Sequence, residues 1–356
     1  MKVLFDIGHP GHVHYFRFAI KELQEKGHKV IVTARQRDII FSLLDFYKIS
    51  YINRGNGSNT RFGKLLYMLK ADLLLLKTCF KKKPDLFVSF SSPYAAQTAW
   101  LLNRPHIAVN DTEHTDKIHS LFTYKFSKYV LTPSSYQNDL GEKHLKFNNI
   151  MEGIYLNSKV FKPDISIYED LSIKTDQPYV FIRFVSWNAH HDFGHAGLDL
   201  ESKRALIQVL SKKFKIFISS EDKLPEEFKE FEINIAPEKM HSVLYYASMF
   251  IGESGTMASE SAYLGTPTVY INSLPLMCYL KLEQEFQLLK HFSSSNAVVD
   301  YVKKLVKEDN LKENTKLKAE EMKSTFNNAT EFFSWFILNY PQTVLQLKNG
   351  NITDID

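Results

Sequence analysis

The segment 252–260 carries the residue types best suited to binding a phosphate. It reads Gly-Glu-Ser-Gly-Thr-Met-Ala-Ser-Glu and follows the apolar run 249–251. A strand, a tight turn and a helix N-terminus are expected in that order. Such a turn directs free backbone N–H groups and the positive end of a helix dipole at one point. Ser254, Gly255 and Thr256 are therefore predicted to bind a phosphate or diphosphate, with a plain helix cap as the alternative.

Glu260 lies about one helical turn beyond this phosphate site, where a carboxylate can accept hydrogen bonds from sugar hydroxyls. A phosphate site followed by a carboxylate indicates a sugar nucleotide as the ligand. Glu253, inside the turn, is included in the predicted donor site. The competing interpretation of Glu260 is a carboxylate on a solvated face or one favoured near a helix start.

A second set of reactive side chains lies in the turn Gly-His-Pro-Gly-His at 8–12, which follows a short apolar strand. Histidine titrates near neutral pH, so one of these rings can take the proton of an acceptor hydroxyl. We select His12 first, and Gly11 allows a ligand to approach the backbone closely. Phosphate binding or helix capping is the alternative. No metal site is expected, because a turn containing Pro10 gives no clear ligand geometry.

Polar residues also follow two other predicted strands. Asp111 and Glu113 follow the strand 106–109 and are candidates for the acceptor site or the general base. Ordinary turn chemistry is the alternative. His190 and His191 follow the strand that begins at residue 179 and are predicted to contact the donor, with zinc ligation or a plain polar loop as alternatives. Arg183 lies within that strand, where a charge is costly unless an acidic partner or a ligand meets it.

These residues can act together only if the fold brings the carboxyl ends of several strands close to one another. Strands at 2–7 and 30–33 flank a stretch with helical spacing at 13–26, which predicts a βαβ unit and a parallel sheet. Further strands are expected at 86–90, 106–109, 129–132, 179–185, 215–219, 250–252 and 268–271, with helical patterns at 201–213 and 241–247. Two doubly wound α/β halves result, and ligands are expected beyond the carboxyl ends of their strands, in a cleft between the halves.

Length and composition agree with two ordinary globular domains. The chain has 356 residues, 44% of them apolar, and its formal net charge of +4 is too small to indicate nucleic-acid binding. The two cysteines fit no metal or redox spacing. The N-terminus shows no secretory signal and no stretch is long enough to span a membrane, so a cytoplasmic location is expected.

The segment 64–83 is apolar with basic ends. A helix of this kind can lie on an anionic membrane surface, which would place the protein at the inner face of the cytoplasmic membrane, or it can be a core helix with a solvated basic end. The aromatic residues at 332, 333, 335, 336 and 340 are more typical of a packed core than of a site.

The phosphate turn, together with Glu260 five residues before Gly265-Thr266-Pro267, resembles the two-domain GT-B superfamily. The related branch holds UDP-N-acetylglucosamine 2-epimerases and the lipid II N-acetylglucosaminyltransferase, in which the equivalent glutamate contacts the ribose. The turn at 8–12 is similar to the transferase's glycine-rich loop, which places His12 at its cleft-facing histidine. The loop before the phosphate strand, with His241, is expected to abut the nucleotide base.

Over nearly its whole length the chain resembles a family of predicted bacterial and archaeal glycosyltransferases. The segment 183–192, which contains Ser186, the pair Ser220-Glu221 and the segment 253–260 carry this resemblance. The resemblance implies two Rossmann-like domains facing each other across a cleft. The expected ranges are 1–160 for the acceptor domain, 161–325 for the nucleotide-sugar domain, 326–349 for a helix returning to the first domain and 350–356 for a tail.

The resulting hypothesis is a metal-independent glycosyltransferase without a cofactor. It would move a sugar from a nucleotide diphosphate, with UDP-sugars first, to a glycan or lipid-linked acceptor in surface polysaccharide biosynthesis. The expected donor-binding residues are Gly11, Arg183, Ser186, His190, His191, Glu221, His241, Glu253, Ser254, Gly255, Thr256 and Glu260. A 2-epimerase-like enzyme and a non-catalytic sugar-nucleotide-binding protein are the two alternatives.

Overall fold

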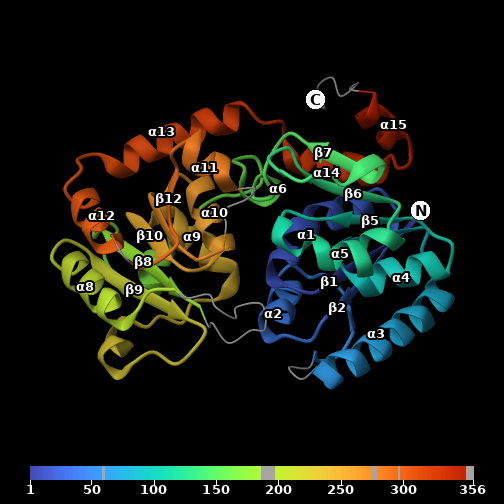
Figure 1. Ribbon diagram of the computed structural model, residues 1–356, viewed down its shortest axis with the longest axis horizontal. Helices are drawn as coiled ribbons and strands as arrows, with labels where there is room; N and C mark the ends of the chain where they lie inside the picture. Colours follow the sequence, from blue (N-terminus) through green and yellow to red (C-terminus); the bar gives the residue numbers. More distant parts are fainter. Residues whose placement is uncertain (58–60, 186–196, 275–278, 296, 350–356) are drawn as a thin grey trace. The chain divides into compact units, whose positions relative to one another are not determined.

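The computed structural model describes residues 1–57, 61–185, 197–274, 279–295 and 297–349 (Figure 1). The chain forms two compact units. The first comprises Met1–Asn157 and the C-terminal segment from Phe326, and the second comprises Ser158–Thr325. The predicted sites Ser186, His190 and His191 lie outside the described residues.

The first unit contains a seven-stranded sheet in the order β3-β2-β1-β4-β5-β6-β7, in which all neighbouring strands are parallel. The strands are β1 (Lys2–Ile7), β2 (Lys29–Ala34), β3 (Ile52–Asn53), β4 (Leu86–Phe90), β5 (His106–Val109), β6 (Tyr129–Pro133) and β7 (His144–Phe147). Strand order reverses between β1 and β4, and ligands of such sheets bind beyond the carboxyl ends at this switch point.

Helices cover both faces of this sheet. Successive residues of a strand face opposite sides. Leu4 packs with residues of α3 (Arg61–Lys82) and α4 (Pro93–Leu101), whereas Phe5 contacts Phe16 of α1 (Pro10–Glu25). The remaining helices of this unit are α2 (Asp38–Phe46), α5 (Asp116–Phe122), α6 (Gly153–Leu156), α14 (Ala329–Leu338) and α15 (Gln342–Lys348). The C-terminal α14 packs on α1, where Phe333 stacks on Phe16 (Figure 1).

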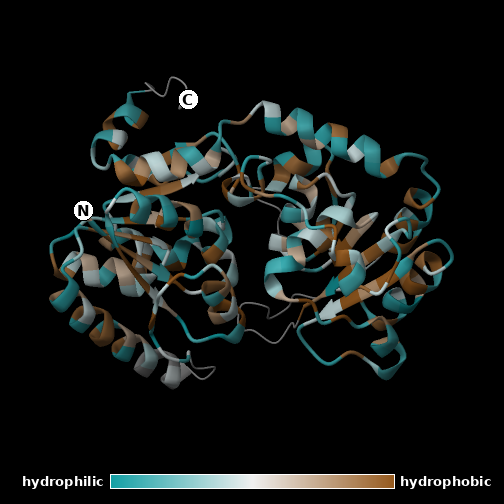
Figure 2. Cartoon of the chain, turned by 180° about the vertical axis from the view of Figure 1, so that it is seen from behind, coloured by the Kyte–Doolittle hydropathy of each residue, from teal (hydrophilic) through white to brown (hydrophobic). Residues whose placement is uncertain are grey.

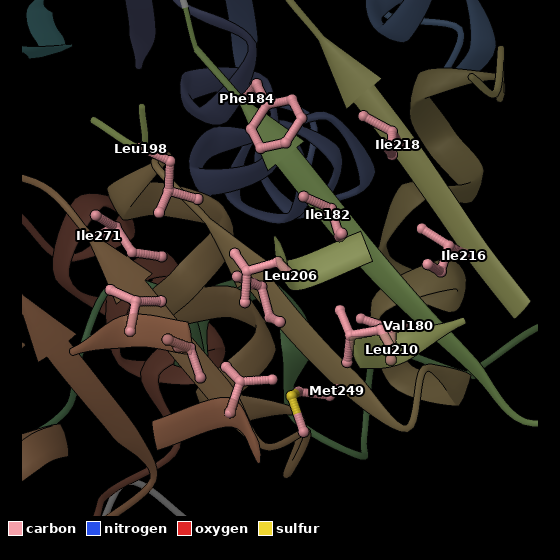
Figure 3. Packing of buried hydrophobic residues seen from close by; sticks show 14 of the residues in the cluster. Val180, Ile182, Phe184, Leu198, Leu206, Leu210, Ile216, Ile218, Met249 and Ile271 are labelled. Carbon is pink, nitrogen blue, oxygen red and sulfur yellow. The ribbon is translucent and has the colours of Figure 1, made fainter. Parts of the chain in front are cut away.

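The second unit contains a five-stranded parallel sheet in the order β12-β11-β10-β8-β9. Its strands are β8 (Tyr179–Phe184), β9 (Lys215–Ser220), β10 (Met249–Gly252), β11 (Thr268–Ile271) and β12 (Leu289–Phe292). Its α-helices are α7 (Ile167–Asp170), α8 (Leu200–Leu210), α9 (Met240–Tyr246), α10 (Gly255–Tyr263), α11 (Leu280–Gln284), α12 (Val298–Leu305) and α13 (Leu311–Ser324). Here the order reverses between β8 and β10. Val180, Ile182 and Phe184 alternate along β8 into one buried apolar cluster (Figure 3).

The predicted α/β fold with two doubly wound halves is confirmed, and the differences concern boundaries and edge strands. Helix α1 begins at Pro10 rather than at residue 13, because His9 caps it and proline is well suited to the first helical position. Strands β3, β7 and β12 lie at sheet edges and were not predicted. They have only two to four residues each, too few to show a clear pattern in the sequence, whereas the longer edge strand β9 was predicted.

Helix α3 has two different faces. Tyr67, Ala71, Leu75 and Cys79 form a buried stripe at a spacing of four residues. Large apolar side chains also remain exposed elsewhere on the helix, at Leu69, Leu73 and Phe80, and Figure 2 shows hydrophobic and hydrophilic residues interspersed along it. Among the described residues, no helix is long and apolar enough to cross a membrane.

Candidate functional site

The N-terminus of α10 lies at the switch point of the second sheet, where β10 ends. Ser254 caps the helix, and its side chain accepts a hydrogen bond from the N–H of Met257 at 3.4 Å. Ser254, Gly255 and Thr256 are all partly exposed. The first turn of α10 therefore offers its backbone N–H groups, its dipole and two hydroxyls on an accessible surface, as an anion site requires.

Two glycines make this turn compact. A Cβ on Gly252 would lie 2.6 Å from the ring of Phe250 and 3.0 Å from the carbonyl oxygen of Arg183. A Cβ on Gly255 would lie 3.1 Å from the hydroxyl of Tyr270. The strand-to-helix turn consequently packs closely against β8 and β11, which positions the first turn of α10 at the carboxyl edge.

Glu253 is buried and serves the protein itself. Its carboxylate accepts hydrogen bonds from the N–H of Val185 at 2.8 Å and from the N–H of Leu198 at 2.7 Å. These two residues stand at the two ends of the segment that contains His190 and His191. Glu253 therefore joins the residue after β8 and a residue shortly before α8 to the end of β10.

Glu260 and His241 form a buried pair. His241 Nε2 lies 3.0 Å from Glu260 Oε1, and Phe161 packs edge-on against the imidazole. The first turn of α10 and this carboxylate lie on one helix, so the predicted spacing between phosphate site and carboxylate is preserved. In this structure Glu260 is held by a histidine from α9, a contact that the sequence did not predict.

Arg183 has the acidic partner that a charge within a strand was expected to need. Its guanidinium donates to Glu221 Oε1 at 3.0 Å and to the hydroxyl of Ser219 at 2.7 Å. These partners come from the end of β9, the strand adjacent to β8. Arg183 and Glu221 thus lie together at the carboxyl edge of the second sheet.

In the first unit, His12 lies in the first turn of α1 and stacks on Phe90, with ring centroids 4.7 Å apart. Its Nδ1 accepts a hydrogen bond from the N–H of Gly8 at 3.2 Å. Burial, together with His9 and Arg54 nearby, lowers the pKa of His12 well below its usual value. The ring is therefore neutral at neutral pH, and because Nδ1 accepts a hydrogen bond its proton is placed on Nε2, which can donate to a ligand.

The neighbouring residues of that turn have local roles. His9 Nδ1 accepts from the N–H of Gly11 at 3.2 Å and caps α1. His14, in the second turn of α1, is buried and stacks on Tyr155. Within the described ranges, no group of three histidine, cysteine, aspartate or glutamate side chains is arranged to hold a metal ion.

Asp111 and Glu113 follow β5 but differ in environment. Asp111 is buried, and its carboxylate accepts hydrogen bonds from Thr112 at 2.7 Å and from Tyr15. Burial raises the pKa of Asp111 to about 6. Glu113 accepts a hydrogen bond from the N–H of Gln137 at 2.7 Å, which ties the loop after β6 to the loop after β5. Tyr15 also stacks on His12 and so links that ring to Asp111.

The sequence did not single out the buried ion pair of Asp6 and Arg54 in the first unit. Asp6, near the end of β1, accepts from Arg54 Nε at 3.0 Å, from Thr33 at 2.7 Å and from Ser92 at 2.5 Å. Arg54 also donates to Tyr67 at 2.9 Å. Asp6 is a charged residue in the apolar strand 2–7. It was a usable signal for a buried partner, because a buried charge is costly without one. That partner lies 48 residues away and could not be identified from spacing.

A cavity of about 620 Å³ opens at the switch point of the first sheet. Its lining combines charged or polar side chains with aromatic and aliphatic ones. The lining includes the nitrogen-bearing side chains of Arg35, Arg54 and His12 and the apolar side chains of Phe90, Ile118 and Phe122. Both sheets therefore place candidate ligand-binding groups at the position expected for doubly wound folds.

Comparison with known proteins identifies the family. The chain belongs to the family described as "Protein of unknown function (DUF354)", which matches residues 1–330. An uncharacterized protein of Methanocaldococcus jannaschii is 27% identical over 324 residues, covering 87% of this chain and 92% of that protein.

Solved structures share the fold at low sequence identity. S. aureus MnaA, solved with UDP, gives a TM-score of 0.68 at 14% identity and covers 97% of each chain. The glycosyltransferase SsfS6 of Streptomyces sp. SF2575, complexed with thymidine diphosphate, gives 0.61 at 13% identity and covers 95% of this chain and 99% of its own. Other similar structures are UDP-GlcNAc 2-epimerases. The resemblance to GT-B proteins is thereby confirmed at the level of the fold.

Proposed function

We propose that this member of the DUF354 family is a metal-independent glycosyltransferase that uses a nucleotide-diphosphate sugar. The observation that carries the proposal is the accessible first turn of α10, with Ser254, Gly255 and Thr256 at the switch point of the second sheet. Structures with the same fold hold UDP or thymidine diphosphate. The backbone N–H groups and the helix dipole would stabilise the leaving diphosphate without a metal ion.

In this proposal Glu260 binds the ribose and is oriented by His241. A buried carboxylate with one oxygen held by an imidazole keeps a fixed direction, which favours recognition of two adjacent hydroxyls. Arg183 and Glu221 would lie near the donor, at the ends of β8 and β9. Glu253 would act indirectly by holding Val185 and Leu198 in place.

The first unit would bind the acceptor and supply the base. Asp111 suits the role of general base better than His12 does, because a pKa of about 6 leaves the Asp111 carboxylate ionised at neutral pH. His12 would instead donate from Nε2, since its Nδ1 is occupied by the N–H of Gly8. Transfer would form a bond from the acceptor oxygen to the anomeric carbon, break the bond to the diphosphate and pass the hydroxyl proton to Asp111.

The proposal also includes the class of acceptor and a contact with a membrane surface. We infer a glycan or lipid-linked acceptor of surface polysaccharide biosynthesis, with UDP-sugars as the first donors to examine. The exposed apolar side chains on α3, at Leu69, Leu73 and Phe80, support contact with a membrane surface. Binding of the purified protein to anionic vesicles, and its loss in Leu73→Ser/Phe80→Ser, would support this part.

A UDP-GlcNAc 2-epimerase is the competing function, because enzymes of that kind share the fold. Incubation with UDP-N-acetylglucosamine alone separates the two functions. Appearance of the manno epimer would replace the transferase by the epimerase. A catalytically idle binding protein would instead bind a nucleotide sugar and show no turnover with any acceptor.

The donor site is tested by thermal shift across nucleoside diphosphates and their sugars, since a bound ligand raises the melting temperature by mass action. We expect the preferred donor to bind Ser254→Ala/Thr256→Val at least tenfold more weakly, because two hydrogen bonds to a charged phosphate are lost. Ser211→Ala/Thr325→Val is the matched control at residues remote from β10 in the chain. Unchanged affinity in the first double variant would remove the phosphate site from α10.

A further inference from the structure

We propose that the cavity at the switch point of the first sheet binds an amphipathic anion, a phosphate group carried on an apolar chain. The inference rests on the proposed function, because it names the chemical class of the acceptor. Three observations within the first unit carry it: two arginines at the cavity, apolar walls, and continuity of those walls with an exposed apolar surface.

The arginines offer donors to an anion. Arg54 is almost fully buried and uses Nε and Nη1 for Asp6 and Tyr67, whereas the structure records no hydrogen bond from its Nη2 among the described residues. Arg35 is partly exposed, and its guanidinium likewise donates to none of the described groups. Both side chains line the cavity. A planar guanidinium suits a phosphate because it donates two parallel hydrogen bonds.

Other polar groups at the cavity agree with an anionic ligand. His12 presents Nε2–H, and the N-termini of α1 and α4 both lie at this end of the sheet. The carboxylates near Arg54 are Asp6 and Asp72. Asp6 is already paired with Arg54, and burial raises the pKa of Asp72 to about 6, which weakens its opposition to an anion at mildly acid pH.

The remainder of the lining is apolar and reaches the outer surface. Phe90 and Tyr94 form walls inside the cavity. Ile118 and Phe122 of α5 line it too, yet they are 62% and 46% exposed. Leu121 adds a further exposed apolar side chain on the same helix. An apolar chain leaving the cavity would cover Ile118 and Phe122, whereas a free inorganic ion would leave them in water.

Three probes divide the ligand into its parts: decyl phosphate below its micelle concentration, inorganic phosphate and decanol. Isothermal titration of the full-length protein should give decyl phosphate at least a tenfold advantage over either of the others. Arg35→Gln should weaken decyl phosphate about tenfold. Because Arg35 donates no described hydrogen bond, this variant should melt close to the unchanged protein. Arg104→Gln, an exposed arginine outside the cavity, is its control.

Phe122→Ser should weaken decyl phosphate severalfold and leave inorganic phosphate unchanged, and Leu121→Ser is the matched control because Leu121 does not line the cavity. The proposal is overturned if Arg35→Gln has no effect, or if decyl phosphate binds no better than decanol. Equal binding of inorganic and decyl phosphate would also overturn it in favour of a small-anion site. Titration of UDP into the same proteins reports on α10 separately, so failure of the proposed donor site and failure of this cavity are distinguishable.

Discussion

Two ion pairs with the same nitrogen-to-oxygen distance mark the difference between the two sheet edges. In the first unit, Arg54 and Asp6 lie 3.0 Å apart with side chains 2% and 0% exposed. In the second unit, Arg183 and Glu221 also lie 3.0 Å apart, but their side chains are 20% and 47% exposed. Equal distances therefore do not mean equal roles.

The reason is the desolvation of charge. A buried pair has already lost its water, so removing one partner leaves the other without compensation, whereas a half-exposed pair exchanges its contact for solvent at little cost. The first edge uses Arg54 and Asp6 to hold β1, β3 and β4 together. At the second edge the pair of Arg183 and Glu221 stays partly exposed to solvent. Topology places both edges alike, and burial gives the two ion pairs different contributions to stability.

The largest effect is expected in the buried pair. Arg54→Met should lower the free energy of unfolding by about 3–5 kcal/mol, because it strands the Asp6 carboxylate in the interior. Adding Asp6→Asn should restore at least half of that loss, since the neutral amide needs no counter-charge. Urea unfolding of the two variants measures both values. A loss below about 1 kcal/mol in Arg54→Met would contradict the contrast between the edges.

The next effect concerns the buried carboxylate of the second unit. Glu253→Gln keeps the shape of the side chain but turns an NH₂ group toward one of the N–H donors at Val185 and Leu198. We expect a loss of about 2–3 kcal/mol in unfolding free energy. Glu226→Gln, on an exposed side chain, should change it by less than about 0.5 kcal/mol. Equal values for the two variants would remove the positioning role of Glu253.

Asp111 should show a smaller effect of opposite sign. Its pKa rises from the usual 3.8 to about 6 on folding, so the folded state keeps a proton that the unfolded chain releases between those values. Stability from this group is complete below the unfolded pKa and is lost as pH rises through the folded pKa. A pKa rise from 3.8 to about 6 corresponds to about 3 kcal/mol, and the weaker hydrogen bonds that an amide oxygen accepts from Thr112 and Tyr15 offset part of it. Asp111→Asn should thus gain about 1–2 kcal/mol above pH 6 and little near pH 4.

The same substitution should abolish transfer if Asp111 is the base, and the unchanged enzyme should lose activity as pH falls below about 6. Thermal melts of both proteins across that pH range, with initial rates on the same samples, give the two readouts. Full activity in Asp111→Asn would return the base role to another group while leaving the stability prediction intact.

The smallest effect is expected for the exposed pair. Glu221→Gln should change the free energy of unfolding by less than about 1 kcal/mol, and even that difference should shrink in high salt. Urea unfolding at low and high ionic strength is the measurement. A salt-independent loss of about 3 kcal/mol would show that Arg183 and Glu221 behave like the buried pair.

The local pattern of the sequence was sufficient for every strand except β3, β7 and β12, and for the order in which those strands occur. Alternating strands and helices predicted both wound halves, because apolar periodicity reports which face of an element is buried. The segment 252–260 predicted the turn and helix N-terminus that α10 supplies, since glycine and serine act through their own backbone and near neighbours. Capping by His9 and the start of α1 at Pro10 also depend on local residues, and the proline was the signal for that boundary.

Only the tertiary structure decided which charged side chains are paired and buried. Arg54 meets Asp6 across 48 residues, Glu253 meets Val185 across 68, and His241 meets Glu260 across 19. These partners depend on strand order and on the packing of helices from different parts of the chain, which local periodicity does not encode. The sequence alone therefore predicted the two halves and the tight turn that begins α10. The order of the strands within each sheet determined which carboxylates serve the scaffold and where a cavity opens.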